Sequence, residues 1–180
     1  MPGRESWRWR ELVLVASWPE FHPNALLRLL LDAEVDLVVV GGYAAIAHGA
    51  TRLTHDLDIC FAGEQPNLER LGEVLIGLHA RLREAPEDLP FVPDARTLAR
   101  MQILTLDTDE GPLDLLVQPS GSPRYAELRG RAEVLEIGSL PVHVASLEDL
   151  IAMKRAAARG KDLLDLAELE AIARLRPGKS

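Results

Sequence analysis

Two aspartates, Asp56 and Asp58, lie two residues apart in the segment Asp56–Phe61, where acidic and apolar side chains alternate. This period of two is typical of a β-strand, so both carboxylates are expected on one face, with their Cα atoms roughly 6.5–7 Å apart. Carboxylates that converge in this way repel each other unless a cation neutralises them. Magnesium prefers oxygen ligands and often binds one or two carboxylates together with substrate phosphates. The pair therefore predicts a divalent-metal site.

A third acid, Asp114, interrupts the apolar segment Leu113–Val117. A buried carboxylate without a partner is costly, so an acid in such a segment needs a cation or a shifted pKa. If its strand lies beside the Asp56–Asp58 strand, three carboxylates meet in a cluster that can hold two metal ions and suits in-line phosphoryl displacement. The alternative is that these acids are solvated on an open sheet face, since an Asp-X-Asp pair alone is a common pattern.

Two glycines, Gly41 and Gly42, follow the β-branched segment Val38–Val40 and precede a short apolar segment, Ala44–His48. The order predicts a strand, a turn and a helix. Glycines at such a turn let backbone N–H groups approach an anion, and the helix N-terminus adds positive potential, so the unit can seat a triphosphate. The spacing does not fit the dinucleotide fingerprint or the P-loop. A simple helix start is the alternative interpretation of the glycine pair.

The combined pattern of residues 39–59, Val-Val-Gly-Gly-Tyr-Ala-Ala-Ile-Ala-His-Gly-Ala-Thr-Arg-Leu-Thr-His-Asp-Leu-Asp-Ile, resembles the signature of the DNA polymerase beta-like nucleotidyltransferase superfamily. The likeness is to a small prokaryotic branch that includes abortive-infection-type toxins. Residues 144–166 resemble the C-terminal helical segment of that branch, and Asp114 fits the third acid between them. The resemblance implies an α/β (α+β) nucleotidyltransferase fold, with a mixed β-sheet flanked by helices and a C-terminal helical segment.

The resemblance also implies an activity, namely transfer of a nucleoside monophosphate from an NTP to an acceptor hydroxyl. Asp56 and Asp58 would ligate Mg²⁺, with two ions as an option, and Asp114 would complete one metal site and help to deprotonate the acceptor. The residues that would contact the nucleotide are Gly41, Gly42, Arg52, Thr54, Lys154 and Lys161. Many relatives have serine where this chain has Gly42, which removes a hydroxyl donor.

The acceptor stays open among tRNA, a protein hydroxyl and a small molecule such as an antibiotic. Membership in a toxin–antitoxin or phage-defence pair, with an antitoxin as partner, is a further hypothesis. A different class of function is a catalytically idle nucleotide-binding or protein-interaction module with the same fold. A glycosyltransferase that uses Asp-X-Asp for a nucleotide sugar is disfavoured by the glycine unit and by the short chain.

Length and composition limit these options. The chain has 180 residues, of which 47% are hydrophobic, and its net charge is −8. These values suit one domain with a real core and disfavour a broad basic groove for nucleic acid. The only cysteine, Cys60, allows neither an internal disulfide nor a cysteine-based zinc site. No apolar stretch is long enough to span a bilayer, and no signal peptide is evident, so we expect a cytoplasmic protein without a membrane partner.

The predicted organisation is an N-terminal extension (1–22), a nucleotidyltransferase core (23–145) and a C-terminal helical segment (146–180) packed on the core. Apolar periodicity predicts helices over 23–33, 44–48, 67–83, 146–158 and 162–175. It predicts strands over 36–40, 56–61, 101–106, 113–117, 132–137 and 140–144. Residues 84–95 are expected to form a loop, and 107–112 a rather long hairpin turn.

Overall fold

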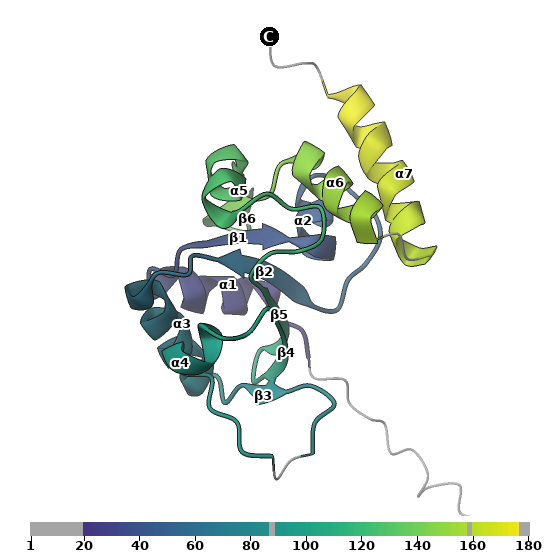
Figure 1. The fold of residues 1–180 in the computed structure, drawn as a ribbon. Helices are drawn as coiled ribbons and strands as arrows, with labels where there is room; N and C mark the ends of the chain where they lie inside the picture. Colours follow the sequence, from purple (N-terminus) through teal and green to yellow (C-terminus); the bar gives the residue numbers. More distant parts are fainter. Residues whose placement is uncertain (1–19, 87–88, 158–159, 177–180) are drawn as a thin grey trace, which may run out of the picture.

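A computed structural model describes residues 20–86, 89–157 and 160–176 of the chain, whereas the side chains of residues 160–162 lie outside this description. Figure 1 shows a mixed sheet with helices on both sides. The strands are β1 (Leu37–Val40), β2 (Leu57–Phe61), β3 (Arg81–Leu82), β4 (Ile103–Thr108), β5 (Gly111–Leu116), β6 (Glu133–Ile137) and β7 (Leu140–Val144). The helices are α1 (Pro23–Asp32), α2 (Gly41–Ala47), α3 (Gln65–Gly77), α4 (Ala95–Leu98), α5 (Tyr125–Arg131), α6 (Leu147–Ala157) and α7 (Gly160–Leu175).

All strands of the described residues form one sheet, in the order β3-β4-β5-β2-β1-β7-β6. Strand β1 runs antiparallel to β2 and parallel to β7, whereas β2 runs parallel to β5. The pairs β4–β5 and β6–β7 are antiparallel hairpins. The sheet is therefore mixed and flanked by helices, which confirms the fold class predicted from the sequence.

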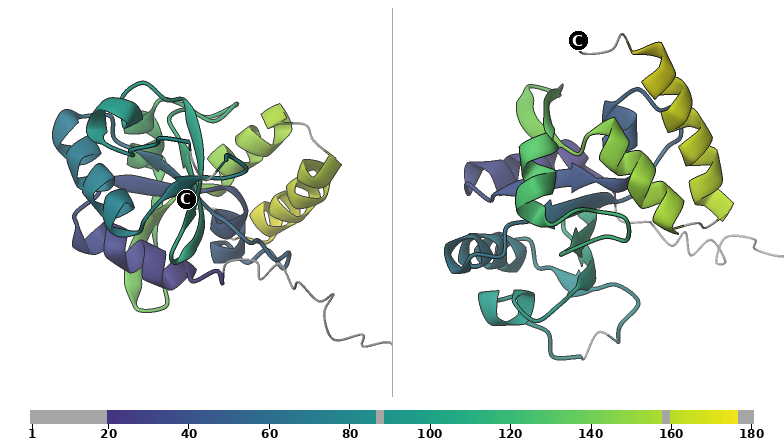
Figure 2. Two further views of the ribbon diagram at one scale, coloured as in Figure 1. Left: turned by 90° about the horizontal axis from the view of Figure 1, so that it is seen from below. Right: turned by 45° about the horizontal axis from the view of Figure 1, so that its top comes forward.

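Two groups of helices enclose the central strands. In Figures 1 and 2, α1, α3 and α4 lie on one side of the sheet, and α2, α5, α6 and α7 lie on the other. Every residue of β1 is buried, as expected of a strand that is covered on both faces. Strands β4 and β5 instead alternate between buried and partly exposed residues, so one face of this hairpin is open. The covered centre holds β1 and β2 rigidly, and the open hairpin face leaves room for a site beside them.

Helix α3 ends earlier than the apolar spacing suggests. His79 has a positive φ of 49°, and the N–H of Ala80 donates to the carbonyl of Leu75 at 3.0 Å. This is a Schellman motif, which closes a helix because its left-handed residue cannot continue the helical backbone. The predicted helix over 67–83 is therefore wrong in its last residues, and Leu82 belongs to β3. Apolar spacing did not reveal the stop because the partly buried leucine of the next strand, Leu82, is in phase with the helix.

The hairpin of β4 and β5 is tighter than expected. Thr108 pairs with Gly111, so Asp109 and Glu110 alone form the turn, and the predicted turn over 107–112 is too long. The hydroxyl of Thr108 donates to the carbonyl of Gly111 at 2.6 Å. This bond continues the hairpin hydrogen bonding into residues 107–110, whose acidic composition is typical of a loop.

Two short helices were missed by the sequence pattern. Helices α4 and α5 were not predicted, because a few residues are too short to display a helical period. The predicted hairpin through Gly138 and Ser139 is confirmed. The predicted start of a helix at Ser146 is also confirmed, since the Ser146 hydroxyl accepts from the N–H of Asp149 at 3.1 Å.

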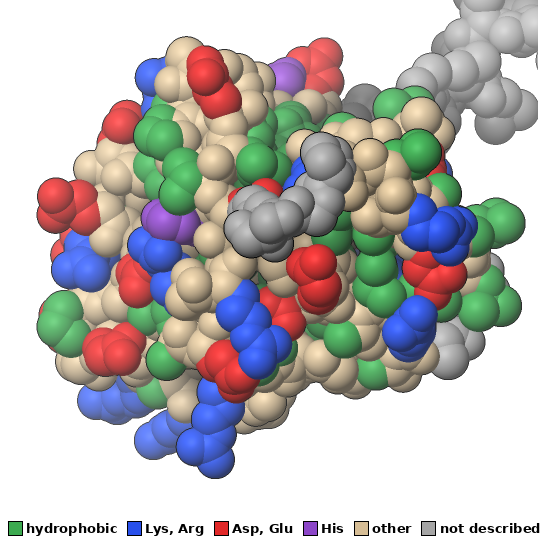
Figure 3. All heavy atoms as spheres, turned by 90° about the horizontal axis from the view of Figure 1, so that it is seen from above, with side chains coloured by type: hydrophobic (Ala, Val, Ile, Leu, Met, Phe, Trp, Pro, Cys, Tyr) green, Lys and Arg blue, Asp and Glu red, His purple; other side chains and the backbone are tan. Residues whose placement is uncertain are grey.

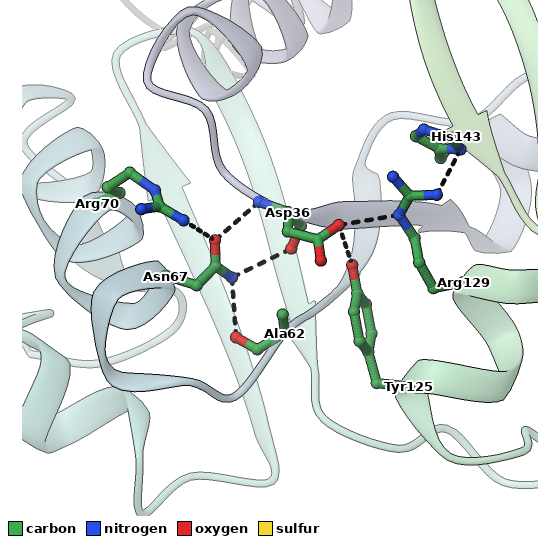
Figure 4. Close-up of polar contacts among 7 residues, drawn as sticks. All are labelled: Asp36, Ala62, Asn67, Arg70, Tyr125, Arg129 and His143. Atoms are coloured by element: carbon green, nitrogen blue, oxygen red, sulfur yellow. Dashed lines mark hydrogen bonds and ion pairs between the residues drawn. The ribbon is translucent and has the colours of Figure 1, made fainter.

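A polar cluster fixes the start of β1, at the opposite end of the strand from the glycine pair (Figure 4). The side chain of Asn67 accepts from the Asp36 N–H at 2.8 Å and donates to the carbonyls of Asp36 and Ala62 at 3.1 and 2.8 Å. The carboxylate of Asp36 accepts from the Tyr125 hydroxyl at 2.8 Å and from Arg129 Nε at 2.9 Å. Helices α3 and α5 are thus tied to the same strand, which limits its movement.

The ends of the chain are only partly described. Residues 1–19 of the predicted extension, 1–22, lie outside the described residues, and the division between 23–145 and 146–180 stays a prediction. The N–H of His22 donates to the carbonyl of Glu110 at 2.9 Å, which ties the segment before α1 to the β4–β5 turn. Within the described ranges, no helix combines the length and the apolar composition needed to cross a membrane.

Candidate active site

Three acids that are distant in the sequence meet beside the glycine turn. Asp58 of β2 pairs in register with Asp114 of the parallel strand β5, and Asp56 lies immediately before β2. One carboxylate oxygen from each residue lies within 4.8 Å of the other two. The structure therefore brings together the three acids that the sequence singled out, and all of them are partly buried.

The pairing pattern explains how an acid can lie within an apolar segment. In β5, Leu113 and Leu115 are buried on one face, while Asp114 and Leu116 are partly exposed on the other. Because successive side chains of a strand alternate in direction, Asp114 points to the open face of the hairpin. The same alternation in β2 turns Asp58 toward the site while Leu57 and Ile59 are fully buried in the core.

The glycine pair makes room for these acids. Gly41 has a φ of +66°, and a Cβ atom on it would lie 2.0 Å from Asp58 Oδ2. A Cβ atom on Gly42 would lie 2.8 Å from Thr54 Oγ1. Glycine is needed at Gly41 both for its backbone conformation and for this close approach. The backbone N–H of Gly42 hydrogen-bonds to the Asp58 carboxylate, so at least one N–H of the turn faces the site.

Thr54 contacts one of the acids directly. Its hydroxyl donates to Asp56 Oδ1 at 2.6 Å. This bond orients the carboxylate of Asp56, which lies just outside the strand and is not held by the β-ladder. Contact of Thr54 with a nucleotide stays a prediction, whereas its bond to Asp56 is a positioning role that the sequence did not suggest.

Burial and the proximity of the other acids perturb the pKa of Asp58 strongly. Burial and the neighbouring carboxylates of Asp56 and Asp114 raise the pKa of Asp58 to about 7, against the opposing effects of Lys154 and the Gly42 N–H. Burial also raises the pKa of Asp114, although the guanidinium of Arg83 opposes this shift. A protein without a cation here must therefore hold Asp58 partly protonated at neutral pH.

Two cations that the sequence assigned to phosphate binding share one buried carboxylate. Asp165 of α7 accepts from Arg52 Nη1 at 2.9 Å through one oxygen and from Lys154 Nζ at 2.7 Å through the other. The side chain of Asp165 is only 9% exposed. Its contacts join α7 to α6 and to the loop after α2.

Helix α7 also holds the loop that carries Arg52. Glu168 Oε1 accepts from both the N–H and the hydroxyl of Thr51, each at 2.8 Å. Because Glu168 lies three residues after Asp165, both side chains occupy the same face of α7. Lys161 lies in the first turn of this helix, but its side chain is outside the described part of the chain. Its predicted contact with the nucleotide therefore stays a prediction.

Arg83 is the residue at this site that sequence reasoning missed. Its Nη2 atom donates to Asp114 Oδ1 at 2.8 Å, and its Nε atom donates to Asp107 Oδ1 at 3.2 Å. The sequence placed Arg83 at the end of a helix, where nothing linked it to Asp114. The signal that could have found it was the need of Asp114 for a cationic partner.

A pocket of about 510 Å³ is lined by the glycine turn, the three acids, Arg52, Thr54, Lys154, Asp165 and Glu168, whereas Arg83 is not among its lining residues. Its floor consists of the glycine turn and the three acids. Its helical wall comes from the loop after α2 and from α6 and α7, and its sheet wall comes from β4, β5 and the segment that follows β5. The sheet wall includes Ile103, Thr105, Leu116 and Pro119. The volume suits a small ligand. A smaller pocket of about 340 Å³ near β3 contains none of the three acids.

The donor set of the floor fits magnesium. All three groups are carboxylates, which are hard oxygen ligands, and the chemistry of Mg²⁺ favours such donors. The pKa of Asp58 is raised first by burial and then by the carboxylates of Asp56 and Asp114, so this site disfavours a bare negative charge. A bound divalent cation would relieve that cost.

The chain belongs to a nucleotidyltransferase family. Residues 24–176 match DUF6036, which is described as a nucleotidyltransferase of unknown function. The match covers most of the chain and confirms the broader part of the resemblance inferred from its motifs. The narrower resemblance to abortive-infection-type toxins stays a prediction. No curated protein matches the chain.

Solved structures with the same fold include two antibiotic-modifying proteins. The solution structure of the antibiotic-resistance factor ANT(2'')-Ia has a TM-score of 0.55 and 19% identity, over 85% of this chain and 86% of that chain. The lincosamide antibiotic adenylyltransferase LnuA, in a lincomycin-bound crystal structure, has a TM-score of 0.56 and 16% identity, over 83% of this chain and 94% of that chain. A crystal structure of ANT(2'')-Ia with adenylyl-2''-tobramycin has a TM-score of 0.53 and 19% identity, over 84% of this chain and 91% of that chain. At such identities the likeness shows the fold.

Proposed function

We propose that this chain transfers a nucleoside monophosphate from a magnesium-bound nucleoside triphosphate to an acceptor hydroxyl, with release of pyrophosphate. The observation that carries this proposal is the convergence of Asp56, Asp58 and Asp114 beside the glycine turn. Three acids that repel one another are costly to hold together, and a catalytically idle nucleotide-binding or protein-interaction module has no need of them. The convergence therefore favours an enzyme.

The three acids are the residues that we assign to one or two Mg²⁺ ions. When bound, the metal supplies positive charge to the phosphate oxygens on which negative charge develops. Thr54 holds the Asp56 carboxylate in a fixed orientation, and the Gly42 N–H does the same for Asp58. Asp58 gives up its proton when a cation binds, because the charged carboxylate is the ligand.

The helical wall is the side that we assign to the triphosphate. Arg52 and Lys154 both line the pocket there, beside the carboxylates of Asp165 and Glu168, so two cationic side chains lie where phosphate oxygens would bind. The turn at Gly41 and Gly42 exposes backbone at the start of α2, where its N–H groups favour an anion. Thr54 and Lys161 complete the nucleotide-binding set that the family resemblance implies.

The sheet wall is the side that we assign to the acceptor. The acceptor oxygen attacks the α-phosphorus, the bond from that phosphorus to the oxygen bridging to the β-phosphorus breaks, and pyrophosphate leaves with the electron pair. The hydroxyl proton passes to the carboxylate of Asp114. Burial raises the pKa of Asp114 above that of an ordinary aspartate, which makes its carboxylate a stronger base.

A small molecule is the acceptor class that the surface and the fold support best. The chain has a net charge of −8, and acidic and basic side chains are intermixed over the face in Figure 3. Binding of tRNA draws its affinity from clustered cations, so this surface favours it less than a small acceptor. The names of the two structural neighbours refer to antibiotic acceptors or products. A protein hydroxyl is the remaining option for the test below.

A role as the toxin of a toxin–antitoxin or phage-defence pair is the finer form of the proposal, and it is supported by the resemblance at residues 39–59 and 144–166. This role predicts that expression of the chain arrests growth, that Asp56→Ala abolishes the arrest, and that an antitoxin encoded with the toxin restores growth. Growth unaffected by expression of an active enzyme would remove the toxin role and leave the transfer activity in place.

Transfer can be measured directly. The protein is incubated with Mg²⁺ and each of four labelled NTPs, in the presence of aminoglycosides, lincosamides, total tRNA or cell lysate. Asp56→Ala and Asp58→Ala are run in parallel, and Asp32→Ala, at an exposed position at the end of α1, serves as the control. Label that appears in one acceptor with the wild-type and control proteins, and in neither site variant, identifies both donor and acceptor. Nucleotide binding without transfer to any acceptor would favour the idle module.

A further inference from the structure

Arg83 is fixed to the sheet by its own backbone. It follows β3 immediately, and its N–H donates to the carbonyl of Thr105 in β4 at 2.9 Å. The guanidinium group is then held at the edge of the hairpin, where Nη2 donates to the carbonyl of Leu106 at 2.9 Å. The side chain is 25% exposed, so water reaches only part of it. A flexible surface arginine would not show this set of contacts.

The same guanidinium bonds to only one of the two carboxylate oxygens of Asp114. Nη2 bonds to Oδ1 at 2.8 Å, while the described residues give Oδ2 no hydrogen bond. Asp107 Oδ1 accepts from Nε of the same guanidinium at 3.2 Å. One oxygen of Asp114 is therefore committed to the protein, and the other stays available to a ligand.

We propose that Arg83 is a positioning residue that keeps Asp114 beside Asp56 and Asp58 and restricts it to one free oxygen for the acceptor. This inference rests on the proposed transfer reaction. Asp114 would otherwise be repelled by the other two carboxylates and would be free to rotate toward solvent. Arginine suits the task because its planar fork can bond two carboxylates and a carbonyl at once, which the ammonium group of lysine cannot match in a fixed plane.

The role has a consequence for metal binding that a purely structural residue does not share. A positive charge beside Asp114 opposes the approach of a divalent cation to the same cluster. Arg83 therefore holds the third acid in place at the expense of metal affinity. Removal of the charge should tighten metal binding and at the same time slow transfer, because Asp114 is no longer held in position.

The test uses two substitutions of Arg83 and a neighbouring control. Arg83→Met removes the charge and keeps most of the stem, whereas Arg83→Lys keeps the charge and loses the fork. Arg81→Met is the control, because Arg81 is an exposed residue of β3 on the same edge strand. Mn²⁺ binding to each full-length protein is measured by calorimetry without nucleotide, and kcat and KM are measured with the acceptor identified above.

We expect Arg83→Met to bind Mn²⁺ about fivefold more tightly than wild type, on the basis of one like charge removed at close range. We expect Arg83→Lys and Arg81→Met to bind it within about twofold of wild type. Both Arg83 variants should lose about tenfold in kcat with KM for the NTP nearly unchanged, because the nucleotide lies on the other wall. Circular dichroism and thermal unfolding show whether each variant is folded. If Arg83→Met is not folded, the kcat of Arg83→Lys alone tests the inference.

Two results overturn the inference while the proposed function survives. One is wild-type kcat in Arg83→Lys, which would show that the fork does not position Asp114. The other is a folded Arg83→Met protein whose Mn²⁺ affinity is equal to or weaker than that of wild type. Failure of the wild-type protein itself to bind Mn²⁺ has a different meaning, because it removes the metal site and the proposed function together.

Discussion

The helical wall and the sheet wall of the pocket arrange their charges in opposite ways. On the helical wall, one carboxylate, Asp165, holds two cations, Arg52 and Lys154. Beside the sheet wall, one guanidinium, Arg83, holds two carboxylates, those of Asp107 and Asp114. The central group in each case fixes two partners of opposite charge.

Because of this difference, the two sides of the pocket suit ligands of different charge. The two cationic side chains of the helical wall suit an anion, and the acids around Arg83 suit a cation or the proton of a hydroxyl. The two walls therefore match the two substrates that we propose, phosphates on one side and a hydroxyl that loses its proton on the other. Substitutions that affect one wall and not the other can test this difference between them.

The largest effect should come from the floor that both walls share. Asp56→Ala removes a carboxylate from the acidic cluster that we assign to metal, and we expect the transfer rate to fall by about 1,000-fold or more, which corresponds to about 4 kcal/mol of transition-state stabilisation. Steady-state rates with the identified acceptor measure this loss. A decrease of less than about tenfold would mean that the cluster is not the reaction centre.

Gly41→Ala should damage the floor by steric means. The new Cβ atom would lie 2.0 Å from Asp58 Oδ2 at a backbone φ of +66°. We expect a loss of about 3 kcal/mol in the free energy of unfolding, because overpacking and left-handed strain act together. Urea denaturation measures it, and Gly63→Ala is the matched control, since no atom lies within 4 Å of its added Cβ. Equal stability of the two variants would contradict the close approach of turn and acid.

The raised pKa of Asp58 predicts that removal of its charge increases stability but abolishes activity. The pKa of Asp58 in the folded protein is about 7, above its ordinary value of 3.8, because of burial first and of Asp56 and Asp114 second. The folded state thus holds the proton more tightly than the unfolded state, and stability falls as the pH rises from about 4 to about 7. Above that range the whole cost is present.

Asp58→Asn should therefore be more stable than wild type at pH 8, by about 2 kcal/mol, although it is inactive. The difference should shrink as the pH falls below 7 and vanish below about pH 3, where wild-type Asp58 is protonated in both states. It should also shrink when Mg²⁺ is added to the wild-type protein. Thermal unfolding at several pH values tests this, and a wild-type protein that gains stability from pH 5 to pH 8 relative to the variant would contradict it.

Asp165→Asn should give the smallest effect and the sharpest comparison of the walls. The amide keeps the shape of the carboxylate but weakens its hold on Arg52 and Lys154. We expect a loss of about 1 kcal/mol in stability and a rise of about fivefold in KM for the NTP, with KM for the acceptor unchanged. The Arg83 variants should show the reverse pattern, with kcat reduced and KM for the NTP preserved. Identical kinetic changes from both walls would mean that the pocket has no such division.

Local patterns were sufficient to predict the floor of the site. Asp56 and Asp58 follow a strand period of two, and Gly41 with Gly42 lies between a strand and a helix, so a short window of sequence contains the whole signal. The same windows predicted the start of α6 at Ser146. They did not predict the end of α3 or the tight turn of the β4–β5 hairpin, because hydrogen bonds made after chain reversal decide both.

The partners of charged residues could not be predicted in this way. Arg83 and Asp114 are 31 positions apart, and Arg52 and Asp165 are 113 positions apart. Many arginines in the chain could serve either acid, and no period or spacing distinguishes them. The pairs exist because the sheet order places β3 near β5 and because α7 packs against α6, which are long-range facts.

By itself, the sequence determined which side chains carry the chemistry and which faces of their strands they occupy, because strand alternation and glycine turns act over a few residues. Tertiary structure alone decided which charges meet: that Asp114 joins Asp58 through parallel pairing of β2 and β5, that Arg83 holds it, and that Asp165 holds Arg52 and Lys154. The physical reason is that the energy of a charge depends on its neighbours and its burial, and both are set when the distant parts of the chain come together.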